Sequence, residues 1–259
     1  MAWQWRRSAL GIVETFPILR RNLLASCDYE LLSDEDGTPL LNQADASHRG
    51  WSTARAVRRQ ERAWSKLTHA AIAGEQRADI AAITNALAAC PPAARVLEVG
   101  CGSGYFADII GHYRPDLTYT GVDFSLAMIQ LAKQKRPTGD FVQGDATDLA
   151  FADASFDVVL DGAALIHIPD WRAALKEYSR ISRECIVLSS LTLANIDSTR
   201  TVRKLAYGAP VMEYIFSRSE LSGEIHRNGR STVEQVETLP YDLENYVGIA
   251  TKSETWICK

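Results

Sequence analysis

Short apolar runs alternate with amphipathic stretches along the second half of the chain. Five of these runs have the length and composition of buried strands, at residues 95–99, 117–123, 140–143, 156–160 and 185–191. Apolar side chains at helical spacing fill two of the intervals, at Phe106, Ile109, Ile110 and Tyr113 and at Trp171, Leu175, Tyr178 and Ile181. Strands that alternate with helices in this way predict an α/β fold with a mainly parallel sheet covered on both faces.

Residues 91–259 are predicted to form this domain. A last pair of strands is expected at Thr232–Leu239 and Ile249–Cys258, after an insertion near residues 192–223. Within the insertion, Ser217 and Glu220 form a capping box at the start of a helix, so we expect both to be structural.

Residues 1–90 are predicted to form a helical N-terminal extension. Two helical faces are visible, one with Val57, Trp64, Leu67 and Ala71, the other with Ile80, Ile83 and Leu87. Ser52 is the expected cap of the first helix. The segment Trp3–Leu24 is interpreted as an ordinary N-terminal helix. Trp51 and three arginines are candidates for a lid, although a solvated basic face explains the arginines at least as well: Arg55, Arg58 and Arg59.

A glycine-rich turn follows the strand at residues 95–99. Its glycines, at Gly100, Gly102 and Gly104, have the spacing G-x-G-x-G, whereas a dinucleotide fingerprint has G-x-G-x-x-G. Glu98 lies two residues ahead of the first glycine, where a carboxylate would repel a pyrophosphate. It would accept a hydrogen bond from a cationic amine, such as the amino-acid end of S-adenosylmethionine.

Further carboxylates lie where the next strands end. Asp123 closes the second strand, ahead of Ser125 as a helix cap, and Asp145 follows the third strand. Open α/β sheets bind ligands at the carboxyl ends of their strands. We therefore expect Asp123 to accept hydrogen bonds from two ribose hydroxyls and Asp145 to accept one from an adenine amine.

Four motifs in this order, VLEVGCGSG, GVDFS, GDATDL and FDVVLDGAALIHIPD, resemble class I S-adenosylmethionine-dependent methyltransferases that act on small molecules, of the type 11-like kind. The resemblance spans roughly residues 95–191. It implies a Rossmann-like, doubly wound sheet of seven strands in the order 3-2-1-4-5-7-6, the last antiparallel, and S-adenosyl-L-methionine as cofactor. It implies cofactor contacts at Glu98, Gly100, Cys101, Gly102, Gly104, Asp123, Phe124, Asp145 and Ala146, with the thiol of Cys101 itself interpreted as a small buried filler.

His167 follows the fourth strand and is the candidate catalytic base, because a neutral imidazole can remove a proton from a hydroxyl or an amine. Support of the loop or contact with the cofactor are the alternatives. The segment 203–218 mixes aromatic and basic residues, so Arg203, Tyr207 and Tyr214 are candidate acceptor-binding residues. A packed connector is an equal interpretation of that segment.

Composition narrows the class of protein. A formal charge of −4 and a pI near 5.8 provide no general basic field for nucleic acid. The five cysteines contain no C-x-x-C pair, which favours neither a disulfide framework nor a metal site. We expect a cytoplasmic monomer or homodimer that acts on a small molecule, with no membrane or nucleic-acid partner.

These patterns predict methyl transfer to an oxygen, nitrogen or carbon atom of a small metabolite. Three alternatives stay open at this point. One is a catalytically idle S-adenosylmethionine-binding module that acts as a sensor or partner subunit. The others are an aminopropyl transferase, which the basic segment disfavours, and a nicotinamide-dependent oxidoreductase.

Overall fold

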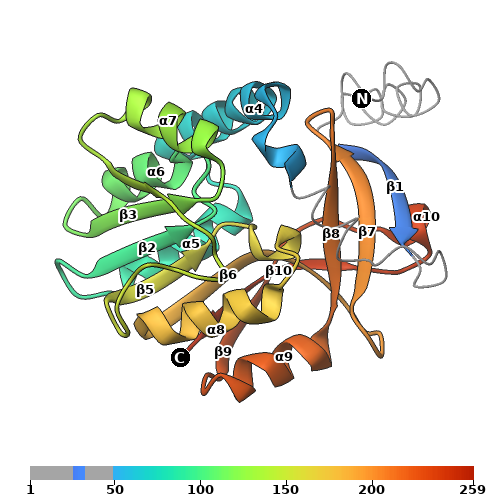
Figure 1. Cartoon of the computed structure of the whole chain (residues 1–259). Helices are drawn as coiled ribbons and strands as arrows, with labels where there is room; N and C mark the ends of the chain where they lie inside the picture. Colours follow the sequence, from blue (N-terminus) through green and yellow to red (C-terminus); the bar gives the residue numbers. More distant parts are fainter. Residues whose placement is uncertain (1–25, 33–48) are drawn as a thin grey trace.

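The computed structural model describes residues 26–32 and 49–259. Its centre is a sheet of parallel strands paired in the order β4-β3-β2-β5-β6 (Figure 1). These are β2 (Arg95–Val99), β3 (Thr118–Asp123), β4 (Asp140–Gln143), β5 (Phe156–Asp161) and β6 (Ser182–Ala194). Beyond β6 follow β10 (Lys252–Cys258), antiparallel to β6, and β9 (Thr232–Leu239), antiparallel to β10. The predicted α/β class is confirmed.

Helices cover both faces of the sheet. This explains why consecutive residues of a strand are apolar, and not only every second residue. In β2, Leu97 and Val99 pack with α8 (Trp171–Ile181), whereas Val96 packs with α5 (Ala78–Ala88) and α6 (Tyr105–Tyr113). Val96 and Leu97 are completely buried. Successive side chains of a strand point to opposite faces, so only a strand covered on both sides buries both of them.

Side-chain caps set the starts of several helices. Ser125 accepts a hydrogen bond from the Met128 amide at the start of α7 (Leu126–Lys135), and Ser217 accepts one from Glu220 at the start of α9 (Arg218–Arg227). Both caps were predicted. The cap of α4 (Ala54–Ile72) is Thr53 instead of Ser52, because Ser52 still belongs to the short 3-10 turn η2 (Arg49–Ser52). The remaining short elements are η3 (Leu165–His167) and α10 (Glu244–Val247). None of the helices described is both long and apolar enough to cross a membrane.

Three antiparallel strands branch from the end of β6. They are β1 (Ser26–Leu32), β7 (Arg200–Ala206) and β8 (Ala209–Ser217), and β8 pairs with β6 only at Leu193↔Phe216 and Ala194↔Ser217 (Figure 1). The insertion near 192–223 is therefore largely a β-hairpin.

This branch changes the picture of the N-terminal extension. Residues 26–32 form β1, whereas the sequence predicted a helical region there. These residues pair with β7, which lies about 170 residues further along the chain. A local sequence pattern carries no sign of such a distant partner. The helix expected at Trp3–Leu24 lies outside the described residues.

A buried ion pair joins the two strands of the hairpin. Lys204 of β7 donates to Glu213 of β8, and their side chains are only 7% and 1% exposed. Thr192 also donates to Glu213, at 2.6 Å, and Tyr241 donates to it at 3.2 Å. Burial is the largest single influence on the pKa of Glu213 and raises it, but the charges of Lys204 and His167 and the hydrogen bonds from Lys204 and Thr192 together hold that pKa below its ordinary value. The pair is therefore ionised and each charge depends on the other.

Replacing one partner of this pair should destabilise the fold strongly. Lys204→Met leaves the Glu213 carboxylate buried without its cation, and we expect a loss of about 3 to 5 kcal/mol in the free energy of unfolding. Lys252→Met is the matched control, since its partner Glu237 lies on a neighbouring antiparallel strand and both are exposed; its expected loss is below about 1 kcal/mol. Urea denaturation measures both. Equal losses would contradict the prediction, whereas Lys204→Met/Glu213→Leu should recover part of the stability.

Candidate active site

A cavity opens at the carboxyl ends of β2, β3 and β5. It contains about 970 Å³ of empty space, part of it continuous with solvent. The glycine-rich loop and the ends of the parallel strands form one wall, and residues of η2, α4 and the β7–β8 turn form the other. This position is the usual ligand site of open α/β sheets.

The glycine loop turns sharply at the edge of the cavity. Gly100 and Gly102 line the cavity with φ values of 71° and 55°, a region that L side chains rarely adopt. A Cβ atom at Gly100 would lie 2.3 Å from the Cβ of Ala164, so a larger residue cannot occupy the position without moving the loop after β5. The Gly100 amide donates to the Val122 carbonyl at 2.8 Å, which anchors the loop to β3.

Asp123 lies at the end of β3 and lines the cavity. Its Oδ2 accepts a hydrogen bond from the Gly102 amide and its Oδ1 accepts one from the Ser125 amide, both at 2.8 Å. Burial raises the pKa of Asp123 to about 6, although the two amides oppose the shift. Each carboxylate oxygen can accept a second hydrogen bond, so Asp123 retains capacity for two hydroxyl groups.

Glu98 lies in β2, one layer behind the cavity wall. It is 2% exposed, and it accepts a hydrogen bond from Tyr119. Its Oε1 lies 3.1 Å from where a Cβ of Gly162 would stand, and Gly162 lines the cavity. Burial raises the pKa of Glu98 to about 8, with the Tyr119 hydrogen bond opposing it. A nearby cation would favour the ionised carboxylate.

Three other predicted cofactor residues also line the cavity: Phe124, Asp145 and Ala146. Asp145 is exposed, and its Oδ1 accepts hydrogen bonds from both the amide and the hydroxyl of Thr147, at 2.9 and 2.7 Å. These contacts form a local turn that fixes the position of the carboxylate at the rim.

The structure does not place the side chain of Cys101, or any part of Gly104, in the wall of the cavity. Cys101 is completely buried and packs against Ile129 and Phe141, as expected of a small filler. Gly104 is the N-cap of α6, and a Cβ there would lie 2.8 Å from the ring of Phe141. Both residues shape the loop from the side away from the cavity.

His167 lines the cavity at the end of η3. Its Nδ1 lies 2.5 Å from the carbonyl oxygen of Met212 in β8. Because a carbonyl oxygen only accepts, Nδ1 carries the hydrogen, and in the neutral imidazole Nε2 carries the lone pair. The Trp51 ring lies beside it, with ring centroids 4.7 Å apart. This tautomer is the one that a base acting through Nε2 requires.

The three predicted acceptor-binding residues have different positions. Tyr207 lines the cavity, with φ at 50° in the β7–β8 turn, and burial raises its pKa. Tyr214 does not line it, because its hydroxyl donates to the Pro169 carbonyl at 2.7 Å. Arg203 is exposed on β7 and pairs with Glu30 of β1, away from the cavity.

Two residues of α4 also line the cavity and were not predicted to do so: Gln60 and Trp64. Their spacing of four places them on one helical face. The sequence pattern assigned Trp64 to the apolar face of this helix. The spacing of four residues from Trp64 to Gln60 was the sequence feature that could have predicted Gln60 as a cavity residue. Trp51, named as a lid candidate, lies in the same wall. Its lid role stays a prediction.

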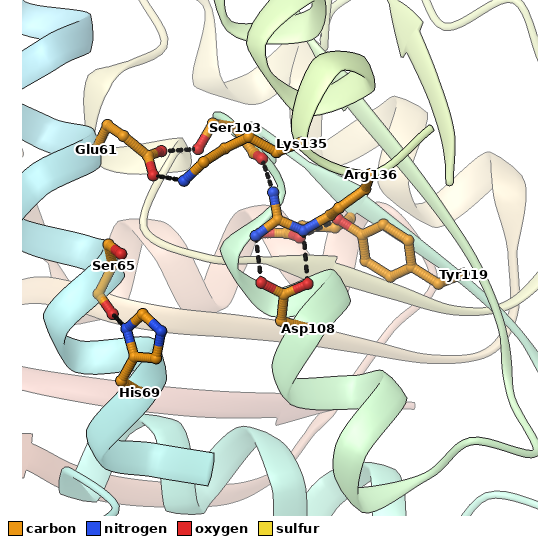
Figure 2. Close-up of polar contacts among 9 residues, drawn as sticks. Glu61, Ser65, His69, Ser103, Asp108, Tyr119, Lys135 and Arg136 are labelled. Atoms are coloured by element: carbon orange, nitrogen blue, oxygen red, sulfur yellow. Dashed lines mark hydrogen bonds and ion pairs between the residues drawn. The ribbon is translucent and has the colours of Figure 1, made fainter. Parts of the chain in front are cut away.

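Polar contacts hold α4 against the glycine loop (Figure 2). Ser103 of the loop and Lys135 of α7 both donate to the Glu61 carboxylate of α4. Arg136 donates to the Ser103 carbonyl at 2.5 Å and pairs with Asp108. Glu61 therefore couples the position of the outer cavity wall to the position of the loop.

No group of residues among those described could hold a metal ion.

Residues 97–184 match the family described as "Methyltransferase domain". Over 115 residues the chain is 38% identical to a demethylmenaquinone methyltransferase of Roseiflexus sp. strain RS-1, covering 44% of this chain and 48% of that protein. Over 91 residues it is 43% identical to a phthiotriol/phenolphthiotriol dimycocerosates methyltransferase of Mycobacterium tuberculosis strain H37Ra, covering 34% of each. The chain therefore matches about half, or less, of the length of these relatives.

Among solved structures, the chain resembles a SAM-dependent methyltransferase from Methanosarcina mazei. The TM-score is 0.53 with 17% sequence identity, and the similarity covers 67% of this chain and 95% of the other. At this level of identity the two proteins share a fold.

The raised pKa of Glu98 predicts a pH-dependent stability difference. The folded protein retains a proton on Glu98 up to about pH 8, whereas the unfolded chain releases it near the ordinary value of 4.5. The free energy of unfolding therefore falls as the pH rises between these values. Glu98→Gln abolishes this loss, so the Tm of the variant minus that of the wild type should increase by several degrees from pH 5 to pH 9.

Differential scanning fluorimetry measures this difference. Exposed Glu184→Gln is the control and should give the same small difference at both pH values. A difference for Glu98→Gln that does not change with pH would show that the carboxylate ionises at its ordinary pKa.

Proposed function

We propose that this chain, which carries a class I S-adenosylmethionine-dependent methyltransferase domain, transfers a methyl group to an oxygen, nitrogen or carbon atom of a small-molecule acceptor. The observation that carries the proposal is the convergence on one cavity of the glycine loop, Asp123 and His167. The match of residues 97–184 to the methyltransferase family supports it. So does the shared fold.

The donor set fits the cofactor. Asp123 would accept hydrogen bonds from the ribose hydroxyls, since its oxygens retain acceptor capacity at the cavity wall. Glu98, behind Gly162, would balance the cationic amino group of the methionine part. Phe124, Asp145 and Ala146 form the rim that would enclose the adenine.

S-adenosylmethionine supplies a methyl group already activated on a sulfonium, so the protein mainly has to position the acceptor. His167 would take the acceptor's proton at Nε2, while Met212 holds the ring through Nδ1. The acceptor then gains the methyl group and loses a proton, and the demethylated thioether leaves. The aromatic wall of Trp51, Trp64 and Tyr207 would limit the access of water to this step.

The relatives support a small-molecule acceptor. One has a name that refers to a demethylmenaquinone and the other to phthiotriol dimycocerosates. The matched segment contains the glycine loop and the strand ends, whereas the β7–β8 hairpin lies beyond it. Because the hairpin lies outside residues 97–184, the family match does not by itself identify the acceptor.

From the sequence, an aminopropyl transferase was disfavoured because the segment 203–218 is basic. The structure gives a different reason. Arg203 pairs with Glu30 outside the cavity and Arg218 pairs with Glu254, so the basic residues of the segment 203–218 do not repel a polyamine there. The described residues of the outer wall instead include no carboxylate that would hold a polyamine cation.

The first test is calorimetric titration with S-adenosylmethionine and S-adenosylhomocysteine, with NAD as the control. Asp123→Ala should weaken binding of both sulfur nucleosides at least tenfold, since each hydrogen bond to a charged acceptor contributes about 1.5 to 3 kcal/mol. Asp197→Ala, at an exposed aspartate, should bind as the wild type does. Binding of NAD alone, or unchanged affinity in Asp123→Ala, would overturn this assignment.

His167→Ala tests the proposed base. We expect kcat to fall by about 10² or more, with the affinity for S-adenosylmethionine within about twofold of the wild type. Release of S-adenosylhomocysteine with the first acceptor obtained from a metabolite screen provides the rate. The control is His226→Ala, at an exposed histidine of α9. An equal loss of rate and of cofactor affinity would instead indicate that His167 binds the cofactor or supports the loop.

A further inference from the structure

Two buried polar atoms in the outer wall of the cavity have no hydrogen-bond partner. They are the indole Nε1 of Trp51 and the amide Oε1 of Gln60. One is a donor and the other an acceptor. Buried polar groups in folded proteins are almost always paired, because an unpaired group loses its hydrogen bonds to water without replacement. Both residues line the cavity, so a molecule bound there would supply the missing partners.

The surroundings of these atoms are aromatic. Trp51 lies against His167, with centroids 4.7 Å apart at 55°, and against Tyr207, with centroids 6.0 Å apart at 60°. Trp64 lines the same wall. Aromatic faces of this kind stack well against a flat apolar body.

The charges of the outer wall also favour an uncharged acceptor. The described residues that line the outer wall, Trp51, Gln60, Trp64, His167 and Tyr207, include neither a carboxylate nor a lysine or arginine. A phosphorylated or strongly cationic acceptor would find no opposite charge among these five residues. The unpartnered polar atoms of this wall are therefore one donor and one acceptor, set among aromatic faces.

We propose that the acceptor is a planar aromatic molecule with at least one free ring hydroxyl. The hydroxyl donates to Gln60 Oε1, and an oxygen of the same molecule accepts from Trp51 Nε1. Gln60 and Trp51 are then specificity-determining residues for the acceptor. This inference rests on the proposed function, and it adds the class of the substrate and the residues that select it.

A pair of probes that differ in one hydrogen tests the proposal. 2-Naphthol has a ring hydroxyl that donates and accepts, whereas 2-methoxynaphthalene can only accept. Isothermal titration measures the Kd of each probe for protein saturated with S-adenosylhomocysteine. The wild type should bind 2-naphthol about tenfold more tightly than 2-methoxynaphthalene, because only the hydroxyl pairs with Gln60.

The variants separate the two residues. Gln60→Leu should reduce the preference for 2-naphthol to within about twofold, and Gln60→Glu, which retains an acceptor oxygen, should keep it. Trp51→Phe should weaken both probes about equally, since both offer an oxygen to the indole N–H. Gln134→Leu, at an exposed glutamine of α7, is the matched control and should behave as the wild type does.

Several outcomes would overturn the proposal. They are equal affinity of the wild type for the two probes, absence of binding by either probe, and an unchanged preference in Gln60→Leu. Loss of S-adenosylhomocysteine affinity in Gln60→Leu would also overturn it, because Gln60 would then contact the cofactor. If the wild type fails to bind S-adenosylhomocysteine, the proposed function fails, and this inference fails with it.

Discussion

The carboxylate of Asp123 is the interaction on which the site depends. One of its oxygens holds the Gly102 amide and the other holds the Ser125 amide, so a single side chain fixes both the glycine loop after β2 and the start of α7 after β3. Burial raises the pKa of Asp123 to about 6, which means that the folded state holds this charge against an unfavourable environment. The same burial leaves the charge poorly solvated, and a poorly solvated carboxylate gains more from a new hydrogen-bond donor than an exposed one does. The unfavourable burial of the Asp123 carboxylate lowers the stability of the folded protein, and the same burial strengthens its hydrogen bonds to a bound ligand.

The parts of the molecule that could be predicted from the sequence are those specified by local pattern. The glycine loop, the strand that ends at Asp123 and the helix capped by Ser125 follow each other within about 30 residues, and each has its own short-range signal. The last strands were also predicted closely, with β9 at Thr232–Leu239. In these segments, several residues that determine the backbone also line the cavity, among them Gly100, Gly102 and Asp123.

The prediction failed where a position depends on a partner far away in the chain. Arg203 was expected near the acceptor, but its strand pairs with β1, and its side chain forms an ion pair with Glu30. Tyr214 had a suitable ring and a suitable neighbourhood, yet the Pro169 carbonyl accepts its hydroxyl. Gln60 had no signal beyond its spacing from Trp64. Composition identifies which segments could contribute to a site, but not which face of a strand or helix points toward it.

The attachment of the β7–β8 hairpin has a further consequence. Its strand β8 joins β6 through only two residue pairs, yet the hairpin supplies Tyr207 to the cavity and the Met212 carbonyl that orients His167. The loops expected to hold the nucleoside belong instead to β2, β3 and β4. In the proposed function, the hairpin part of the acceptor wall and the cofactor-binding loops are thus encoded in separate stretches of the gene. The hairpin, together with the segment that carries Trp51 and Gln60, can diversify by substitution while the cofactor-binding loops stay unchanged, which makes these two segments the natural targets for evolving or engineering new acceptor preferences.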